Sequence, residues 1–407
     1  MPLGLGSNLS KTGLTTPGIV TDNLVLKHKY DAGSVVPISD GAAYFVKTNT
    51  DYIEIPDNSN LSFGDGSNDS AFSISAWIYP KDVDRFRIVT KSTASKSEWV
   101  FTLNNANKPC LFLYDDVIGQ QEGRIGTAIT ANQWYHITAT YNGVGGTSAN
   151  AGINIYVNGA LDNAELSDAG SYTAMHNDTG GAVRIGNFQD SGTSVDYADG
   201  YICNVGIWSS VLTQPQIKSI MNKNYAGLTD SEKTNLVSWW NLDSAYDIDD
   251  TTESTETTQY VFDNHHGGGD TLGSDVMAGG DMSSDSGWNL DSGWSISNGK
   301  LVCETSSFNT AYKTTSGLTE GKLYKVTVDV ATTNGNPLLI YLGEGHSGSV
   351  TANVRGRTQT TGTNVFYLVA GATNQIYFYA GSVSARWNGT IDNVIIQEVN
   401  GNHGVLS

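Results

Sequence analysis

The stretches that decide the fold are Trp134-Tyr135-His136-Ile137-Thr138-Ala139-Thr140-Tyr141 and Ile153-Asn154-Ile155-Tyr156-Val157-Asn158-Gly159. In both, apolar and polar side chains alternate with a period of two, which is typical of a strand with one buried face. Asn158-Gly159 predicts a tight hairpin turn, because a type I′ turn needs positive φ at both central residues. Together they predict half-buried β-strands.

The composition is that of a turn-rich all-β protein. The 407 residues include 46 glycines but only 8 prolines, and 15% are charged. Glycine serves tight turns, while Thr, Tyr and Val favour strands. The length is sufficient for two or three domains, each with its own core. The three cysteines lack C-x-x-C spacing and an even count, so they indicate neither a zinc site nor a disulfide framework.

The charge and hydropathy of the chain exclude some partners. A formal net charge of −19 argues against nucleic acid or an anionic membrane surface. The chain contains no apolar run long enough to predict a membrane-spanning segment. The N-terminus has no basic segment followed by an apolar one, so we expect no signal peptide.

Alternating runs recur along the chain and predict two antiparallel β-sandwiches. The expected parts are an N-terminal arm (1–40), a first sandwich (41–243), an acidic loop and Gly-rich linker (244–270), a second sandwich (271–400) and a tail (401–407). One short helix is expected over 213–221, because Thr213 is a good N-cap and Gln216 follows three residues later.

The first predicted sandwich resembles the laminin-G-like family of concanavalin A-like domains. The resemblance covers about residues 41–225 and rests on Tyr52–Ile55, Phe72–Trp77, Trp134–His136, Tyr156–Gly159 and Gly200–Trp208. It implies a β-sandwich of a family that mostly holds sugars or other proteins. Trp77, Trp134 and Trp208 are expected in its core, and His136 is expected to be packed and hydrogen-bonded.

The second predicted sandwich resembles carbohydrate-binding jelly rolls. The motifs are Gly280-Asp281-Met282, Gly293-Trp294-Ser295-Ile296 and Ile391-Asp392-Asn393-Val394. In that family an acidic residue near the start and an Asp in the last strand often share a structural calcium ion, and the matching positions are Asp281 and Asp392. The resemblance therefore implies structural calcium, for which carboxylate oxygens are suited. No other cofactor is expected.

Sugar binding usually needs an exposed aromatic ring flanked by hydrogen-bonding side chains. In the second sandwich the candidates are Tyr312, Tyr341, Arg386 and Trp387. Tyr197, which lies in a loop beside two aspartates, is the candidate in the first. For each aromatic side chain, packing in the core or at its rim is the alternative. His265 and His266 beside Asp263 are either a polar turn or a metal site.

Motifs for catalysis are missing from the sequence. Glycoside hydrolases need two carboxylates facing one sugar bond, and the E-x-D-x-E strand pattern of laminarinase-like enzymes does not occur. Neither G-x-S-x-G nor H-E-x-x-H is found. The sequence therefore predicts a non-enzymatic protein, with a secreted glycan-active enzyme as the disfavoured alternative.

The order of the modules is similar to that of virion surface proteins of marine tailed phages. The resemblance implies a capsid decoration protein or head fibre at the virion surface, which presents lectin-like modules for glycan or host-surface adhesion. The N-terminal arm would contact other virion proteins, and a homo-oligomer is expected. The alternatives are a tail-fibre or tailspike tip that recognises host glycans and, for the arm, an undocked tail.

Overall fold

The computed structural model describes residues 36–406, except positions 94, 117, 169, 179, 191–192, 244–245, 248–258, 262, 267–271, 284–286, 305–308, 344–354 and 383–384. Residues 35–407 form one compact unit. The expected N-terminal arm, residues 1–40, lies almost wholly outside the described residues. The described part confirms the all-β prediction, with antiparallel sheets and a few short helices.

The first sandwich begins with a seven-stranded antiparallel sheet. Its order is β1 (Ala43–Phe45), β15 (Asp199–Trp208), β3 (Phe72–Asp82), β8 (Tyr135–Tyr141), β9 (Ile153–Val157) and β10 (Ala160–Leu161), and β16 (Leu236–Trp240) also pairs with β15. The alternating stretches 134–141 and 153–159 contain β8 and β9, which are neighbours in this sheet. Asn158 and Gly159 have φ of 50° and 74°, which confirms the predicted turn.

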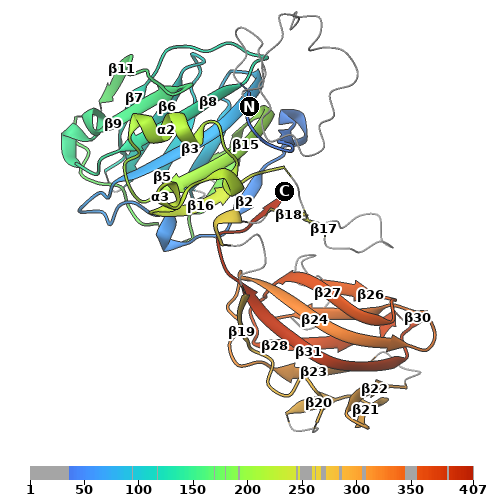
Figure 1. The fold of residues 1–407 in the computed structure, drawn as a ribbon. Coiled ribbons are helices and arrows are strands. Elements are labelled where there is room, and N and C mark those ends of the chain that lie inside the picture. The colour runs from blue at the N-terminus through green and yellow to red at the C-terminus, as the bar shows by residue number, and fades with distance from the viewer. Residues whose placement is uncertain are drawn as a thin grey trace, which may run out of the picture. The chain divides into compact units, whose positions relative to one another are not determined.

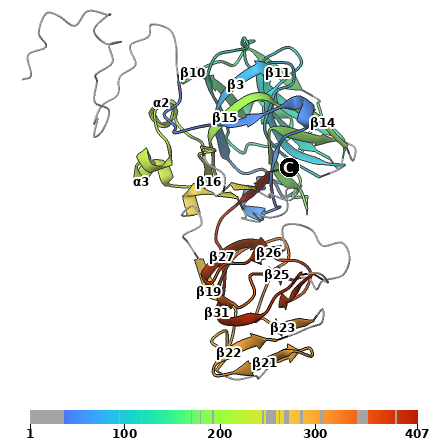
Figure 2. The same ribbon diagram turned by 90° about the vertical axis from the view of Figure 1, so that its right-hand side faces the viewer.

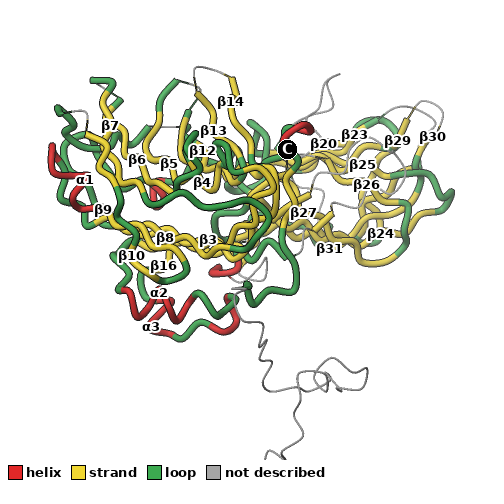
Figure 3. The backbone as a smooth tube through the Cα atoms, turned by 90° about the horizontal axis from the view of Figure 1, so that it is seen from above, coloured by secondary structure: helices red, strands yellow, loops and turns green. Residues whose placement is uncertain are grey.

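Opposite this sheet lies a ten-stranded one. Its order is β11 (Glu165–Asp168), β7 (Gln120–Ile125), β6 (Pro109–Asp115), β5 (Ser97–Leu103), β4 (Arg87–Ser92), β12 (Ala182–Ile185), β2 (Ile53–Ile55), β32 (Gly404–Leu406), β18 (Gln259–Val261) and β17 (Tyr246–Asp247). A hairpin of β13 (Asn187–Asp190) and β14 (Thr193–Tyr197) follows β12. Ile74, Trp99, Phe101, Ile137 and Ile207 are fully buried in the core of this sandwich. Figure 3 shows the two sheets as separate layers.

Short helices cover part of the outer face of the seven-stranded sheet (Figure 3). They are α2 (Gln214–Ile220) and α3 (Asp230–Lys233); α1 (Ala149–Gly152) precedes β9. Thr213 and Gln216 form the expected capping box of α2. Trp208 packs with Trp239 and Ile217 in a separate buried cluster on this side. The prediction that Trp208 belongs to the main core is therefore wrong, because α2 provides a second apolar layer.

The second sandwich also consists of two antiparallel sheets (Figure 2). One contains β21 (Trp294–Ser297), β22 (Lys300–Cys303), β31 (Gly389–Val399), β24 (Leu323–Thr332), β27 (Gly362–Val369) and β19 (Leu272–Asp275). The other contains β20 (Trp288–Leu290), β23 (Thr310–Thr314), β28 (Gln375–Tyr379), β25 (Leu338–Leu342) and β26 (Arg355–Thr358), and β29 (Gly381–Ser382) pairs with β30 (Ala385–Arg386). Its core includes Val326, Val328, Ile340, Phe378 and Ile391.

The C-terminal strand belongs to the first sandwich. β32 pairs with β2 on one side and with β18 on the other (Figure 1). The second sandwich is thus inserted between two neighbouring strands of the first. Residues 404–406, expected in a tail, therefore form a strand of the first sandwich, and the expected loop 244–270 contains β17 and β18. Strands of two or three residues are too short to show a period in the sequence.

Two further features bear on the sequence predictions. All three cysteines are buried. Among the described helices, none has the length and apolar character needed to span a membrane.

Candidate functional site

The strongest candidate site is a hollow of about 270 Å³ on the outer face of the ten-stranded sheet. Phe112 lies directly opposite Val100 on one neighbouring strand and Gly123 on the other. Residues opposite each other in an antiparallel ladder share a face of the sheet. Leu111 and Leu113 alternate with Phe112 and face the core. Val100 and Phe112 line the hollow, and its size suits about one sugar unit.

The Phe112 ring lies across the bare backbone of Gly123. A Cβ atom on Gly123 would come within 2.5 Å of Phe112 Cδ1, so the ring occupies the place of a side chain there. Phe112 is half-buried and lines the hollow, as does Tyr114 two residues later. An aromatic ring supported in this way is a fixed apolar surface for the C–H face of a sugar.

Arg87 is held at one end of the hollow by several contacts. Its Nη1 donates to Thr102 Oγ1 at 3.1 Å, and its Nη2 donates to Asp196 Oδ2. The guanidinium also lies 5.1 Å from the centre of the Phe188 ring. The side chain is 12% exposed. These contacts fix the position of the guanidinium before any ligand arrives.

Further polar groups surround the hollow. Arg85 is half exposed and lies 3.6 Å from Asp196. Asn104 orders the turn between β5 and β6, since its Oδ1 accepts from the backbone N–H groups of Ala106 and Lys108. The next residue, Asn105, is exposed, and Gln121 lies opposite Tyr114. Amide and guanidinium groups of this kind can hydrogen-bond sugar hydroxyls.

The lining has no pair of carboxylates. Among the described residues that line the hollow there is no Asp or Glu. The carboxylate of Asp196, outside the lining, forms ion pairs with Arg85 and Arg87. Hydrolysis of a glycosidic bond by the usual route requires two carboxyl groups facing it. The arrangement is therefore suited to binding.

Two of the predicted sugar-binding residues, Tyr312 and Tyr341, lie in one row of the second sandwich. Each is directly opposite Tyr377, on the same face of the five-stranded sheet. The Tyr312 and Tyr377 rings are stacked with centroids 5.2 Å apart. Tyr341 is only 1% exposed, so its ring has no surface for a sugar. Tyr377, which lies between the other two in this row, was not predicted from the sequence.

The two remaining candidates of the second sandwich lie elsewhere. Trp387 is fully buried in the core and stacks on Trp294 with ring centroids 6.0 Å apart, so the prediction that it binds sugar is wrong. Trp387 belongs to the buried core of the second sandwich, where burying so large an apolar ring is stabilising. Arg386 lies in β30, and its carbonyl accepts from the side chains of Asn334 and Asn336. It is not part of the tyrosine row.

Tyr197 lies beside the hollow without lining it. It ends β14, and its ring is 6.4 Å from that of Tyr52. Its neighbour Asp196 is the residue that contacts the hollow, through Arg85 and Arg87. Arg87, Phe112 and Gln121 were not among the site residues predicted from the sequence. The signal was present for Phe112 and Tyr114, which alternate with buried leucines and so face away from the core.

The predicted calcium ligands do not form a shared site. Asp281 Oδ1 accepts from Ser283 N at 3.2 Å and lines an open hollow beside Asn393. Asp392 instead accepts from Lys300 Nζ at 2.9 Å and is not among the residues that line that hollow. In the described part of the chain no group of three His, Cys, Asp or Glu side chains is placed to hold a metal ion. These residues do not fit the expected calcium site.

His136 and His265 both make hydrogen bonds within the first sandwich. His136 is buried, and its Nε2 lies 2.8 Å from Ser75 Oγ; burial lowers the pKa of His136 to about 3. His265 donates its backbone N–H to Asp263 Oδ1 at 3.0 Å. This contact is that of a polar turn, which was predicted as the alternative to a metal site. The side chain of His266 lies outside the described part.

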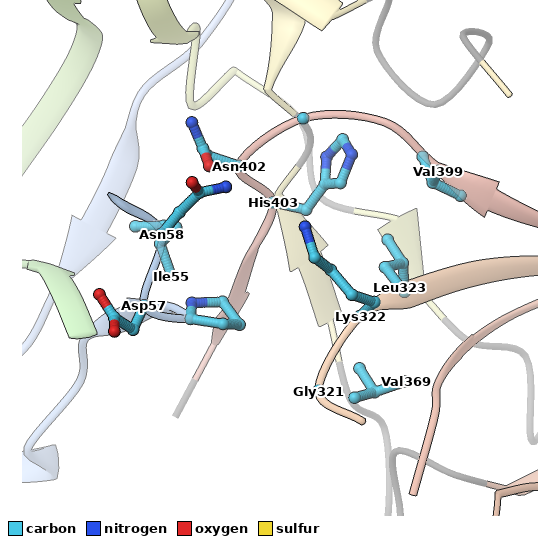
Figure 4. A pocket seen from close by; sticks show the side chains of 12 residues that line it. Ile55, Asp57, Asn58, Gly321, Lys322, Leu323, Val369, Val399, Asn402 and His403 are labelled. Carbon is cyan, nitrogen blue, oxygen red and sulfur yellow. The ribbon is translucent and has the colours of Figure 1, made fainter. Parts of the chain in front are cut away.

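A smaller pocket lies beside the segment that leads into β32. Its volume of about 40 Å³ is far below that of a sugar site. Figure 4 shows that Lys322 and His403 point into it, while the carboxylate of Asp57 is turned away from them. This pocket has room for water and not for a glycan.

Comparison with known proteins assigns the fold of the first sandwich. Residues 47–218 match the family described as the concanavalin A-like lectin/glucanases superfamily. This part of the chain has the lectin-like fold. The second sandwich lies outside the match. None of the curated proteins compared with the chain matches it.

Two solved structures illustrate the similarity. The native heptameric SAP-like pentraxin from Limulus polyphemus is 19% identical, with a TM-score of 0.29, and the alignment covers 44% of this chain and 84% of that one. The CBM40 of Ruminococcus gnavus IT-sialidase, bound to α2,3-sialyllactose, is 12% identical, with a TM-score of 0.31, and covers 46% and 100%. At these TM-scores neither likeness bears on ligand or activity.

Proposed function

We propose that the first sandwich binds glycans in the hollow formed by Arg87, Phe112, Tyr114 and Gln121. The observation that carries the proposal is that the Phe112 ring, which rests on Gly123, lines the same hollow as the Arg87 guanidinium, which Asp196 holds in place. The apolar ring can pack against the C–H face of a pyranose, while the fixed donors can hydrogen-bond its hydroxyl groups. The lectin-like fold of this part of the chain supports the same function.

A glycan array tests this proposal. We expect the full chain to bind a restricted set of glycans, and Phe112→Ala to lose that signal while retaining its circular dichroism spectrum. Tyr312→Ala, in the second sandwich, is the matched control and should bind as the wild type does. A signal lost in Tyr312→Ala and kept in Phe112→Ala would move the site to the second sandwich. No binding by the wild type would contradict the proposal.

We also propose that binding is not followed by hydrolysis. The hollow has no pair of carboxylates among its described lining residues, which supports this. Incubation with each bound glycan, followed by mass spectrometry, should return the glycan intact. Shorter products would instead favour the secreted glycan-active enzyme.

We infer that the chain presents this site on the surface of a phage particle, as a decoration protein or head fibre. The support is the resemblance in module order, together with a hollow whose described lining residues include no pair of carboxylates. Gold-labelled antibody against residues 271–400 should mark the heads of intact particles. Label at the tail end would identify a tail-fibre tip, and no label would contradict a virion role. Docking of the N-terminal arm on other virion proteins and homo-oligomer formation belong to the same proposal.

A further inference from the structure

A buried lysine, Lys91, lies in the first sandwich, away from the hollow. Lys91 is the fifth residue of β4, and its side chain is fully buried (0% exposed). Its Nζ lies 2.6 Å from Asp57 Oδ1, 2.6 Å from the Gly181 carbonyl oxygen and 3.5 Å from Glu98 Oε1. A buried ammonium is costly even when it is paired.

Glu98 is the second buried charge-bearing group of this cluster. It is also fully buried, and its Oε1 accepts from Ser62 Oγ at 3.2 Å and from Asp178 N at 3.0 Å. Its Oε2 has no hydrogen-bond partner among the described residues. Burial raises the pKa of Glu98 to about 7, although Lys91 opposes the shift. The carboxyl group can therefore take up and release a proton near neutral pH.

Asp57 is the third member of the cluster. It follows β2, and its second oxygen, Oδ2, accepts from Gly180 N at 2.7 Å. A backbone N–H at this place stabilises negative charge on that oxygen, as the donors of an oxyanion hole do. The other oxygen, Oδ1, faces Lys91. Figure 4 shows the carboxylate directed away from the neighbouring pocket, so Lys322 does not compete for it.

We propose that Lys91 and Asp57 condense into an intramolecular isopeptide bond, with Glu98 transferring the protons. Lys91 Nζ gives up a proton to Glu98, and the resulting amine attacks Asp57 Cγ, where the Gly180 N–H stabilises the charge that develops on oxygen. A nitrogen–carbon bond forms, and one carbon–oxygen bond breaks. The two protons that leave the nitrogen depart with the released oxygen as one water molecule, so the ammonium and the carboxylate become an amide. No other reactant is needed.

The surroundings favour this reaction over a lasting ion pair. The reacting groups are fixed at contact distance, which removes most of the entropic cost of bringing them together. Lys91 is fully buried and the Asp57 side chain is 26% exposed, and the amide product leaves no buried ammonium. Trp99 and Val183, which lie opposite Lys91 on the two neighbouring strands, are fully buried and shield the Lys91 side chain from water.

The bond would join strands that are not neighbours. β4 and β2 lie on either side of β12, so the link ties the loop after β2 to β4 across an intervening strand. Such a cross-link would strengthen a domain that carries load when a particle adheres to a surface. This role is independent of what the hollow binds.

Mass spectrometry of the intact chain tests the proposal. We expect the wild type to be lighter than its sequence by one water molecule, with Met1 removal taken into account, and a protease digest to yield a branched peptide joining Lys91 to Asp57. Glu98→Gln, shown to be folded by circular dichroism, should have the full mass. Asp57→Asn should lose ammonia in place of water if attack occurs at this carbon.

Three results would overturn the proposal. The first is a folded wild-type chain of full mass. The second is a water loss that maps to other residues. The third is a Glu98→Gln chain that cross-links as completely as the wild type, which would remove Glu98 from the mechanism.

Discussion

The backbone N–H of Asn402 donates to Asp263 Oδ2 at 3.1 Å, so the segment that leaves the first sandwich is joined to the segment that returns to it. Asp263 is fully buried, and its other oxygen accepts from the N–H groups of Trp239 and His265. Asn402 in turn contacts Ser238, and its carbonyl accepts from Trp240 Nε1. One carboxylate therefore organises the place where the inserted domain is attached.

Asp263→Asn should destabilise the first sandwich by about 2 kcal/mol or more. The amide nitrogen of Asn would face a backbone N–H in either orientation of the side chain, which leaves buried donors unpaired. The free energy of unfolding by urea measures the change. Asp84→Asn, at an exposed turn, is the matched control and should alter it by less than about 0.5 kcal/mol. Equal effects of the two changes would contradict this role.

His136 should make the first sandwich less stable in acid. Its pKa is lowered to about 3 in the folded chain by burial, against about 6.5 when unfolded. The unfolded chain therefore binds a proton that the folded chain does not. The stabilisation is complete above about pH 6.5 and is lost as the pH falls toward 3, by about 1.4 kcal/mol for each pH unit.

Comparison with His136→Gln isolates this contribution from that of the carboxylates. The free energy of unfolding is measured for both chains at pH 7, 6 and 5. We expect the difference between them to narrow as the pH falls. A difference that stays constant would mean that His136 does not titrate in this way.

Thr213→Ala should cost about 1 kcal/mol. Thr213 caps α2 by accepting from Gln216 N, and the Gln216 side chain accepts from Thr213 N at 2.9 Å. The helix covers Trp208 and Trp239, so its loss also exposes apolar surface. Thermal unfolding followed by tryptophan fluorescence measures the effect. Thr213→Ser keeps the cap and should be close to wild type; a loss as large in Thr213→Ser would show that the hydroxyl is not responsible.

Gly123→Ala should weaken glycan binding about tenfold with little effect on folding. The new Cβ would meet Phe112 Cδ1 at 2.5 Å, so the ring must leave its place over the backbone. The contact of one ring with an apolar face contributes about 1.4 kcal/mol, which corresponds to a tenfold change in affinity. Titration calorimetry with the best glycan measures the change. Gly317→Ala, where a Cβ meets nothing within 4 Å, is the control. Unchanged affinity of Gly123→Ala would argue against stacking on Phe112.

Sequence reasoning succeeded where the signal is local. The period of two in β8 and β9, the positive φ of Asn158 and Gly159 and the cap of α2 all depend on neighbouring residues. The two-sandwich architecture followed from the repetition of such signals. For the same reason, Phe112 and Tyr114 were recognisable as outward-facing residues of a strand.

What the sequence did not reveal depends on long-range pairing. β32 has three residues, and its place between β2 and β18 results from contacts with residues more than a hundred positions away. The hollow likewise needs the hairpin of β13 and β14 to bring Asp196 to Arg87. Trp387 looked like a turn residue because Asn388 and Gly389 follow it, yet the sandwich buries its ring.

Hydrogen–deuterium exchange with a saturating glycan from the array tests the central claim most directly, because it locates the bound ligand without any substitution. The account predicts slower exchange in β5, β6 and β7, centred on residues 100–121, and no change in the second sandwich. Protection confined to β23 and β28, around Tyr312 and Tyr377, or no protection in the first sandwich, would contradict it.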